Sequence, residues 1–239
     1  MPLSNNGRAI SDTADTPVER RRPLPRPLSR SERIADRWVN GIAIVVAVLG
    51  VIALIAIALP QDSLRLTVSV LTYSVGLLAM VVCSALYNAR ESSPRRDLLR
   101  RLDHAAIFVM IAATYTPFLA LTVGSAWSHG LLVYVWVVAA LGVALKLIWV
   151  DRFERLSVVL YLFLGWTILV AFKSLLASVS TATVVLLAAG GVLYTLGVTF
   201  HLWERLNYQQ PIWHGFVFAA SACHYAAVLI GIVLPGAHA

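Results

Sequence analysis

The chain has 239 residues, of which 59% are hydrophobic and only 13% are charged, and its formal net charge is +7. A soluble globular domain carries about 25% charged residues, so a soluble fold is excluded for a chain with this much apolar surface to bury. The charges gather in short clusters between long apolar runs, a distribution typical of membrane-spanning helices joined by loops.

Residues 1–38 are predicted to form a disordered basic tail on the cytoplasmic side. They are rich in Pro, Ser and Arg, with almost no periodic apolar positions, and hold eight of the seventeen arginines. Such a tail is expected to lie against anionic lipid, and nucleic acid is not an expected partner. Because no apolar stretch precedes the arginines, the first span is expected to act as its own insertion signal instead of a cleavable signal peptide.

Seven apolar segments of membrane-spanning length follow, taking about 17–25 residues as sufficient for a ~30 Å hydrocarbon core. They are residues 39–59, 66–88, 104–123, 128–150, 157–175, 181–203 and 211–234. Together they predict a single seven-transmembrane domain over residues 39–234. Residues 235–239 are then a short external C-terminus.

The orientation of the spans follows from the arginines in the short loops. The tail and the loop NARESSPRRDLLRRLD carry most of them, whereas the opposite side has Arg65 as its clear positive charge. Since short cytoplasmic loops are enriched in Lys and Arg, the N-terminus is predicted inside and the C-terminus outside. The predicted fold class is all-α: an integral membrane seven-helix bundle, N-in/C-out.

Several polar or small residues within the spans are interpreted as structural. Lys146 and Lys173 lie near span ends, so their side chains are predicted to extend to the membrane interface. His224 lies deep in the seventh span and is interpreted as a single buried histidine with a carbonyl or hydroxyl partner. The small residues of AAGGVLYTLG in the sixth span are predicted to let helices of the same bundle approach closely.

The remaining polar residues converge on the predicted cytoplasmic end of the bundle. They are Ser84 and Asn88 of the second span, Asp103 and His104 of the third, His201 of the sixth, and Gln210 and His214 of the seventh. Two of these pairs are spaced four residues apart, which puts both members on one helix face. A single inward-facing polar pocket is therefore predicted.

Three segments identify a family resemblance. They are ERIADRWVNG, SALYNARESSPRRDLLRRLDHAAIFVMIAATYTPF and GVTFHLWERLNYQQPIWHGFVFAASACHYAAV. They resemble the hemolysin III proteins, bacterial relatives of the progestin and adipoQ receptor family, and the likeness covers residues 32–234. The resemblance implies a multi-pass protein of the bacterial inner membrane with a role in membrane or lipid homeostasis or sensing.

The resemblance also implies a site. In that family three histidines hold a zinc ion near the cytoplasmic side, and a serine and an aspartate flank a zinc-bound water, as in a ceramidase-like amide hydrolase. Ser84 and Asp103 match the serine and aspartate, which makes them the candidate catalytic residues, and His214 matches one metal ligand. The other two ligand positions are Asn88 and Gln210, and a first-helix position that is often histidine is Asn40.

The zinc site that the resemblance implies is therefore expected to lack two of its three ligands in this chain. Neutral amide oxygens suit calcium better than zinc. Three interpretations follow: a metal-free site whose side chains bond to each other between helices, recruitment of His104 or His201 as substitute ligands, or binding of a different ion. The paired loss of two ligands favours the metal-free site.

Three functions from different classes are compatible with these residues. The favoured one is a non-catalytic or metal-depleted membrane protein that senses or organises lipid, which requires only the bundle and a polar pocket. The alternative is a zinc-dependent intramembrane amide hydrolase. A pore-forming hemolysin is disfavoured, because the outer halves of the spans show no continuous polar stripe.

Overall fold

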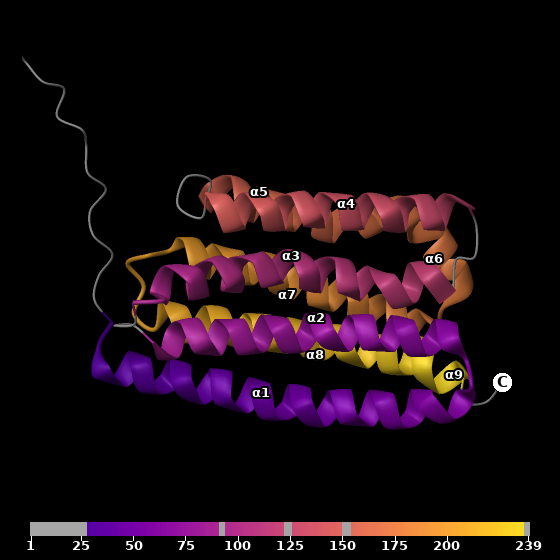
Figure 1. Cartoon of the computed structure of the whole chain (residues 1–239), viewed down its shortest axis with the longest axis horizontal. Helices are drawn as coiled ribbons and strands as arrows, with labels where there is room; N and C mark the ends of the chain where they lie inside the picture. The colour runs from indigo at the N-terminus through magenta and orange to yellow at the C-terminus, as the bar shows by residue number, and fades with distance from the viewer. Residues whose placement is uncertain (1–27, 91–93, 122–125, 150–153, 237–239) are drawn as a thin grey trace, which may run out of the picture.

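The structure is a computed structural model that describes residues 28–90, 94–121, 126–149 and 154–236. Within these ranges it is all-helical, and seven helical segments are long and apolar enough to cross a membrane. The predicted fold class is thus confirmed. The helix axes run side by side, and the start of α1 and the end of α9 lie at opposite ends of the bundle (Figure 1). The N-in/C-out orientation stays a prediction.

The helices follow the predicted spans in order. They are α1 (Arg30–Ala58), α2 (Leu64–Ala89), α3 (Arg96–Leu121), α4 (Ala126–Ile148), α5 (Glu154–Trp166), α6 (Phe172–Ser178), α7 (Thr181–Leu202), α8 (Gln209–Val228) and α9 (Leu234–Gly236). A 3-10 turn (Leu59–Gln61) extends α1, a 3-10 segment (Thr167–Ala171) joins α5 to α6 in the fifth span, and a π-helical segment (Leu229–Val233) joins α8 to α9 in the seventh.

The first helix begins earlier than its apolar stretch. Ser29 accepts the backbone N–H of Glu32, and the Glu32 carboxylate accepts the backbone N–H of Ser29, so the two form a capping box. Of the predicted tail, residues 1–27 lie outside the described residues, and residues 30–38 are helical. The first span therefore starts with about two and a half largely polar turns that belong to the bundle.

The central element is α3, which packs on both of its sides. One apolar core joins it to α1, α2 and the C-terminal segments through residues such as Tyr73 and Phe118. A second core joins it to α4 and α5 through residues such as Phe108 and Leu164. Because α3 carries both cores, its first turns place polar groups toward two different sides of the bundle.

Glycines set the closest helix contacts. A methyl group on Gly190 of α7 would lie 2.4 Å from the ring of His224 in α8, and one on Gly197 would lie 2.9 Å from Phe216. The predicted use of the small residues within one bundle is thus confirmed. Between α3 and α4, a methyl group on Gly142 would lie 2.5 Å from the Phe108 ring. These helices can approach this closely only because glycine has no side chain.

The fifth span is not a continuous α-helix, and the hydroxyl of Tyr115 in α3 bonds to backbone groups at the break. Its hydroxyl accepts the backbone N–H of Ile168 at 2.8 Å and lies 2.8 and 2.7 Å from the carbonyl oxygens of Leu164 and Gly165. Backbone groups without a partner are costly within a bilayer, so irregular backbone at this depth needs such a side chain.

Candidate functional site

The first helix presents a row of polar side chains to the bundle. Glu32, Asp36 and Asn40 follow each other at four-residue spacing, and each is at most 8% exposed. Glu32 accepts the backbone N–H of Tyr208 at 2.7 Å. Tyr208 is the N-cap of α8 and has a left-handed backbone, with φ of 58°. The row on α1 thus fixes the start of α8 and positions the next polar group on that helix.

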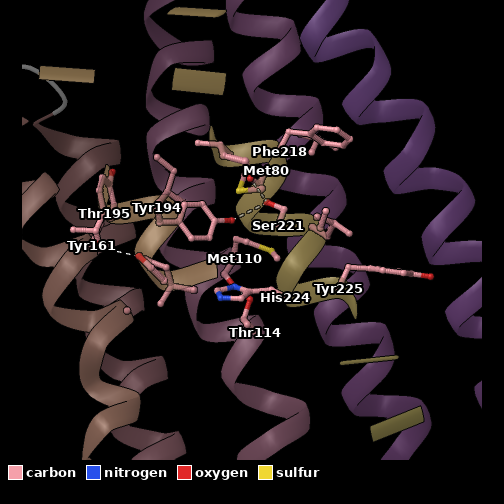
Figure 2. A pocket seen from close by; sticks show the side chains of 18 of the residues that line it. Met80, Met110, Thr114, Tyr161, Tyr194, Thr195, Phe218, Ser221, His224 and Tyr225 are labelled. Atoms are coloured by element: carbon pink, nitrogen blue, oxygen red, sulfur yellow. Dashed lines mark hydrogen bonds between the residues drawn. The ribbon is translucent and has the colours of Figure 1, made fainter. Parts of the chain in front are cut away.

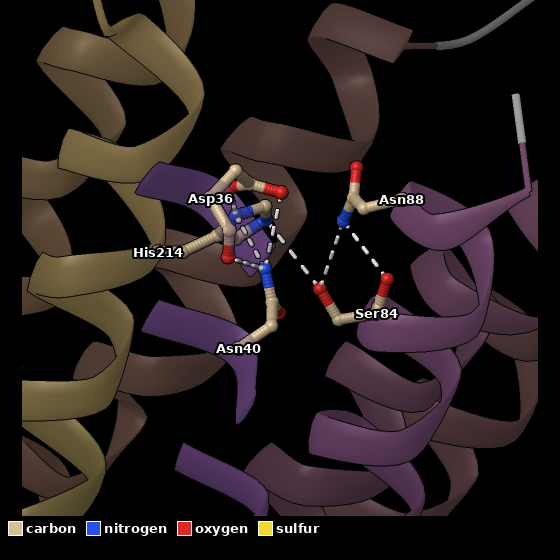
Figure 3. Close-up of polar contacts among 5 residues, drawn as sticks. All are labelled: Asp36, Asn40, Ser84, Asn88 and His214. Carbon is tan, nitrogen blue, oxygen red and sulfur yellow. Dashed lines mark hydrogen bonds and ion pairs between the residues drawn. The ribbon is translucent and has the colours of Figure 1, made fainter. Parts of the chain in front are cut away.

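That group is His214, whose ring lies between α1 and α2 (Figure 3). Its Nδ1 is 2.5 Å from Oδ1 of Asp36, and its Nε2 is 3.4 Å from Oγ of Ser84. The two side chains of the first pair are 12% and 5% exposed. Both ring nitrogens are therefore engaged by groups of the protein itself.

The donors and acceptors around His214 form one consistent chain. With a hydrogen on Nδ1, the ring donates to Asp36, and Nε2 is left to accept the Ser84 hydroxyl. Asn40 donates Nδ2–H to the Asp36 backbone oxygen at 2.9 Å and lies 3.2 Å from the Asp36 carboxylate. The Asp36 carboxylate is thereby held by a ring and an amide from two helices.

The second helix completes this group. Asn88 donates Nδ2–H to the backbone oxygen of Ser84 at 2.8 Å, and the same nitrogen lies 3.4 Å from Ser84 Oγ. Asp103, at the start of α3, lies close enough to interact with Ser84 and His214. We refer to Asp36, Asn40, Ser84, Asn88, Asp103 and His214 as the His214 cluster.

The structure brings together most of the predicted site residues but not all of them. Ser84, Asn88, Asp103 and His214 meet in the His214 cluster, whereas Gln210 lies partly buried in the first turn of α8. His104 follows Asp103 and so points about 100° away around α3, and the ring of His201 in α7 lies 4.9 Å from that of Trp213. The single predicted pocket thus holds two separate polar groups.

The residues of the His214 cluster do not fit the three-histidine zinc site that the family resemblance implies. The cluster supplies one imidazole, and its two nitrogens already face Asp36 and Ser84. The amide of Asn88 is directed at Ser84. Over the described part of the chain, no three side chains of His, Cys, Asp or Glu gather in a way that holds a metal ion, and His104 and His201 are not part of such a group there.

The second polar group is basic, and we call His104, Lys146, Ser157 and His201 the basic cluster. The charges that act on the His104 ring include those of Lys146 and His201. Lys146 is only 1% exposed. The prediction that its side chain extends to the interface is therefore wrong, because the lysine lies on the face of α4 that packs against α3. Lys173, by contrast, is exposed, as its predicted role requires.

Both groups line one interior cavity of about 530 Å³. Its lining is mainly apolar and includes Met80, Met110 and Phe218 (Figure 2). Deeper in the bundle, Tyr194 and Ser221 share a hydrogen bond of 2.7 Å. The volume lies within the roughly 300–1,000 Å³ of small-molecule sites, and an apolar cavity with a few polar groups at one end suits an amphiphile.

His224 lies in this deeper part, as predicted for a single buried histidine. Its Nε2 is 3.3 Å from the backbone oxygen of Leu187, and its ring is 5.6 Å from that of Tyr194. The prediction of a carbonyl partner is confirmed. The ring lies against Gly190 and serves the packing of α7 on α8.

Reasoning from the sequence missed Glu32 and Asp36. Both were assigned to the disordered tail, because the first span was placed from its apolar residues alone. Two signals were present: the Ser-x-x-Glu capping pattern at Ser29, and the spacing of four between Glu32, Asp36 and Asn40. A polar row at helical spacing just before an apolar helix indicates that the helix has already begun.

Comparisons with known proteins show the family of the chain. Residues 31–225 match a family model described as Haemolysin-III related. The chain belongs to the hemolysin III family. The predicted resemblance is thus confirmed over most of the chain.

Similar curated proteins span nearly the same length as this hemolysin III family member. It is 36% identical to the hemolysin-3 homolog of Bacillus subtilis (strain 168) over 198 residues, covering 83% of this chain and 93% of that protein. It is 35% identical to hemolysin-3 of Bacillus cereus over 206 residues, covering 86% and 94%. The human monocyte to macrophage differentiation factor is 27% identical over 206 residues, covering 82% and 83%. No solved structure matches the chain.

The pairing of Asp36 with His214 predicts a measurable coupling. Asp36→Ala is expected to lower the free energy of unfolding by about 1–3 kcal/mol, because it leaves a buried ring nitrogen without its acceptor. The double variant Asp36→Ala/His214→Ala is expected to lose less than the sum of the single variants, by roughly 0.5–3 kcal/mol. Unfolding of the purified protein in mixed micelles measures all three.

Glu204→Ala is the control, since Glu204 is exposed at the same end of the bundle, and its effect is expected to stay within about 0.5 kcal/mol. Additive effects of the Asp36 and His214 variants would show that the two side chains do not support each other.

Proposed function

We propose that this hemolysin III family protein binds a lipid acyl chain inside its helix bundle and acts in membrane lipid homeostasis or sensing without a zinc centre. Its place in the bacterial inner membrane, and contact of the basic tail with anionic lipid, belong to the same proposal. The observation that carries it is the mainly apolar cavity whose lining includes Asn40, Ser84, Asp103 and His214 of the His214 cluster.

The dimensions of the cavity support an acyl chain as its occupant. Lining residues on α3 extend from Asp103 to Phe118, a stretch of about 22 Å at 1.5 Å per residue. A ~30 Å hydrocarbon core is made of two layers of chains, so this length accommodates one chain. The lining also includes Leu169 and Phe172, which are 55% and 42% exposed. Exposed apolar residues at the edge of the cavity offer a route from the surrounding lipid.

The bonding within the His214 cluster supports action without zinc. Each nitrogen of the one imidazole has a protein partner, and the Asn88 amide bonds to Ser84 instead of leaving a ligand position open. Polar side chains that bond across helices stabilise a membrane bundle by about 0.6–2 kcal/mol each. In this proposal the residues that match the family's catalytic site join α1, α2 and α8.

A matched pair of glycine variants tests lipid binding. Gly191 lines the cavity, and a methyl group there would lie 3.6 Å from Trp166, so Gly191→Leu fills space without displacing backbone. It is expected to remove most of the lipid that copurifies with the wild-type chain, as measured by native mass spectrometry from non-ionic detergent.

The control is Gly130→Leu, because Gly130 is exposed on α4 and a methyl group there meets nothing within 4 Å. Wild-type protein that carries no lipid, or equal lipid in both variants, would contradict the proposal.

A second candidate function is metal-independent acyl transfer, which one observation favours. Ser84, His214 and Asp36 follow each other in the order of a nucleophile, a base and the carboxylate that orients the base. In such a step Ser84 Oγ attacks a carbonyl carbon while its proton passes to His214 Nε2. The leaving group then takes that proton, and water later releases the acyl group.

Labelling by an alkyl fluorophosphonate tests this second candidate. If Ser84 is an activated nucleophile, the wild-type chain is labelled at Ser84, and both Ser84→Ala and Asp36→Asn lose the label. If the cluster only joins helices, as the first proposal holds, labelling stays at the level of Ser84→Ala. The second outcome is the expected one, because the 3.4 Å from Ser84 Oγ to His214 Nε2 exceeds the ~2.6–3.2 Å of an activated pair.

A further inference from the structure

Lys146 is a charged side chain inside a membrane bundle. It lies in the last turn of α4, is 1% exposed and lines the interior cavity. Removing an ammonium group from water costs several kcal/mol even after relaxation, so charged residues within spans are rare and usually have a function. The His214 cluster does not use this lysine.

Close packing of α3 on α4 puts Lys146 there. Gly142 admits the Phe108 ring against the α4 backbone. Lys146 follows Gly142 by four residues, and His104 precedes Phe108 by four. Both therefore lie one turn nearer the end of the bundle, on the faces of α4 and α3 that Gly142 and Phe108 bring together. Arg101 donates to the backbone oxygens of Leu147 and Ile148. Its guanidinium thereby holds the end of α4 against the start of α3.

The fifth and sixth spans complete the basic cluster. Ser157 of α5 is 1% exposed, and Tyr161, four residues later, donates its hydroxyl to the backbone oxygen of His104 at 2.9 Å. The Tyr161 ring is 4.5 Å from that of Phe108. Lys146, Arg100 and His201 lie near enough to act on the His104 ring. Groups from four helices thus line this end of the cavity, and the ammonium group of Lys146 is among them.

Asp103, the carboxylate next to His104 in the sequence, belongs to the His214 cluster. Asp103 is the one acidic residue among the described residues that line the cavity. It precedes His104, so it points about 100° away around α3. The groups that act most strongly on Asp103 are His214, Ser84 and Asp36. Lys146 and Ser157 have interactions of their own within the bundle, so a ligand would join an existing network.

We propose that the basic cluster binds the anionic head group of a single-chain lipid, with Lys146 as the principal contact and the acyl chain in the cavity. An anion at this point gains charge-assisted hydrogen bonds in a site with little water. The inference rests on the proposed function, because the chain of the ligand occupies the same cavity. It adds that the protein selects its lipid by the negative charge of the head group.

A series of ligands with one tail and different heads tests the inference. Oleate, oleyl phosphate and oleyl alcohol are titrated separately into the full chain in non-ionic detergent, and bound ligand is measured by native mass spectrometry. Wild-type protein is expected to bind at least one of the two anions about tenfold or more tightly than the alcohol, a factor worth ~1.4 kcal/mol. The preferred anion distinguishes a carboxylate from a phosphate head.

Variants locate the effect. Lys146→Met keeps the length of the side chain without its charge and is expected to bind the anions no better than the alcohol. Lys146→Arg is expected to retain the preference for anions. The matched control is Lys173→Met, since Lys173 is exposed on α6 and its loss is expected to change nothing.

The outcomes separate this inference from the proposed function. If wild-type protein binds the alcohol and the anions equally, the inference is overturned while acyl-chain binding stands, and this comparison does not depend on any variant being stable. The same holds if Lys146→Met keeps the full preference for anions. If wild-type protein binds none of the three, the proposed function fails and the inference fails with it.

Discussion

The short contact between His214 and Asp36 sets the architecture of the end of the bundle where α1 begins. A buried ring and a buried carboxylate within a membrane cannot hydrogen-bond to water, so each needs partners within the helix bundle. His214 finds them on α1 and α2, and Asp36 finds them on α8 and on its own helix. With the Glu32 contact to the start of α8, this pairing fixes which faces of three helices meet. The apolar cavity begins where these polar contacts end.

Two polar clusters with different chemistry follow from the central place of α3. Its first membrane-embedded turn carries Asp103 on one side and His104 on the other, so one cluster receives a carboxylate and the other a basic group. In the His214 cluster, both nitrogens of the His214 ring have partners on neighbouring helices. The basic cluster places the ammonium group of Lys146 next to apolar space, which suits the head group of an anionic amphiphile. In this account the residues that resemble a catalytic site stabilise the bundle, and ligand recognition lies one helix face away.

The sequence predicted the helices well because membrane spans are determined by a simple physical requirement: about twenty apolar residues with their backbone groups bonded internally. All seven spans, the close approach at Gly190 and the carbonyl partner of His224 could be predicted on such grounds. The start of α1 could not be predicted from apolar residues, because its first turns are polar and are held by Ser29 and by α8. The burial of Lys146 also depends on tertiary packing. Its position near a span end favours a side chain that extends to the membrane interface. The contact of Gly142 with Phe108 instead packs the Lys146 face of α4 against α3.

The residues of the site could be predicted from the sequence, but which of them lie together could not. Family resemblance led to Ser84, Asp103 and His214, and they do meet. Which side of α3 each polar residue faces depends on helix rotation, which a uniformly apolar span does not reveal in its sequence. The positions of Asp36 and Lys146 escape prediction for other reasons: the first turns of α1 are polar, and Lys146 lies near a span end, which favours the interface.

The measurement that tests the central claim most directly is the zinc content of the purified, detergent-solubilised chain, by elemental mass spectrometry. Four proteins are compared: wild type, His214→Ala, Asn88→His/Gln210→His, and that double variant with His214→Ala added. The account predicts no stoichiometric zinc in the wild type, about one ion per chain when the two histidines complete a three-ligand site, and its loss with His214→Ala. About one zinc ion per wild-type chain, lost in the single variant His214→Ala, would contradict it.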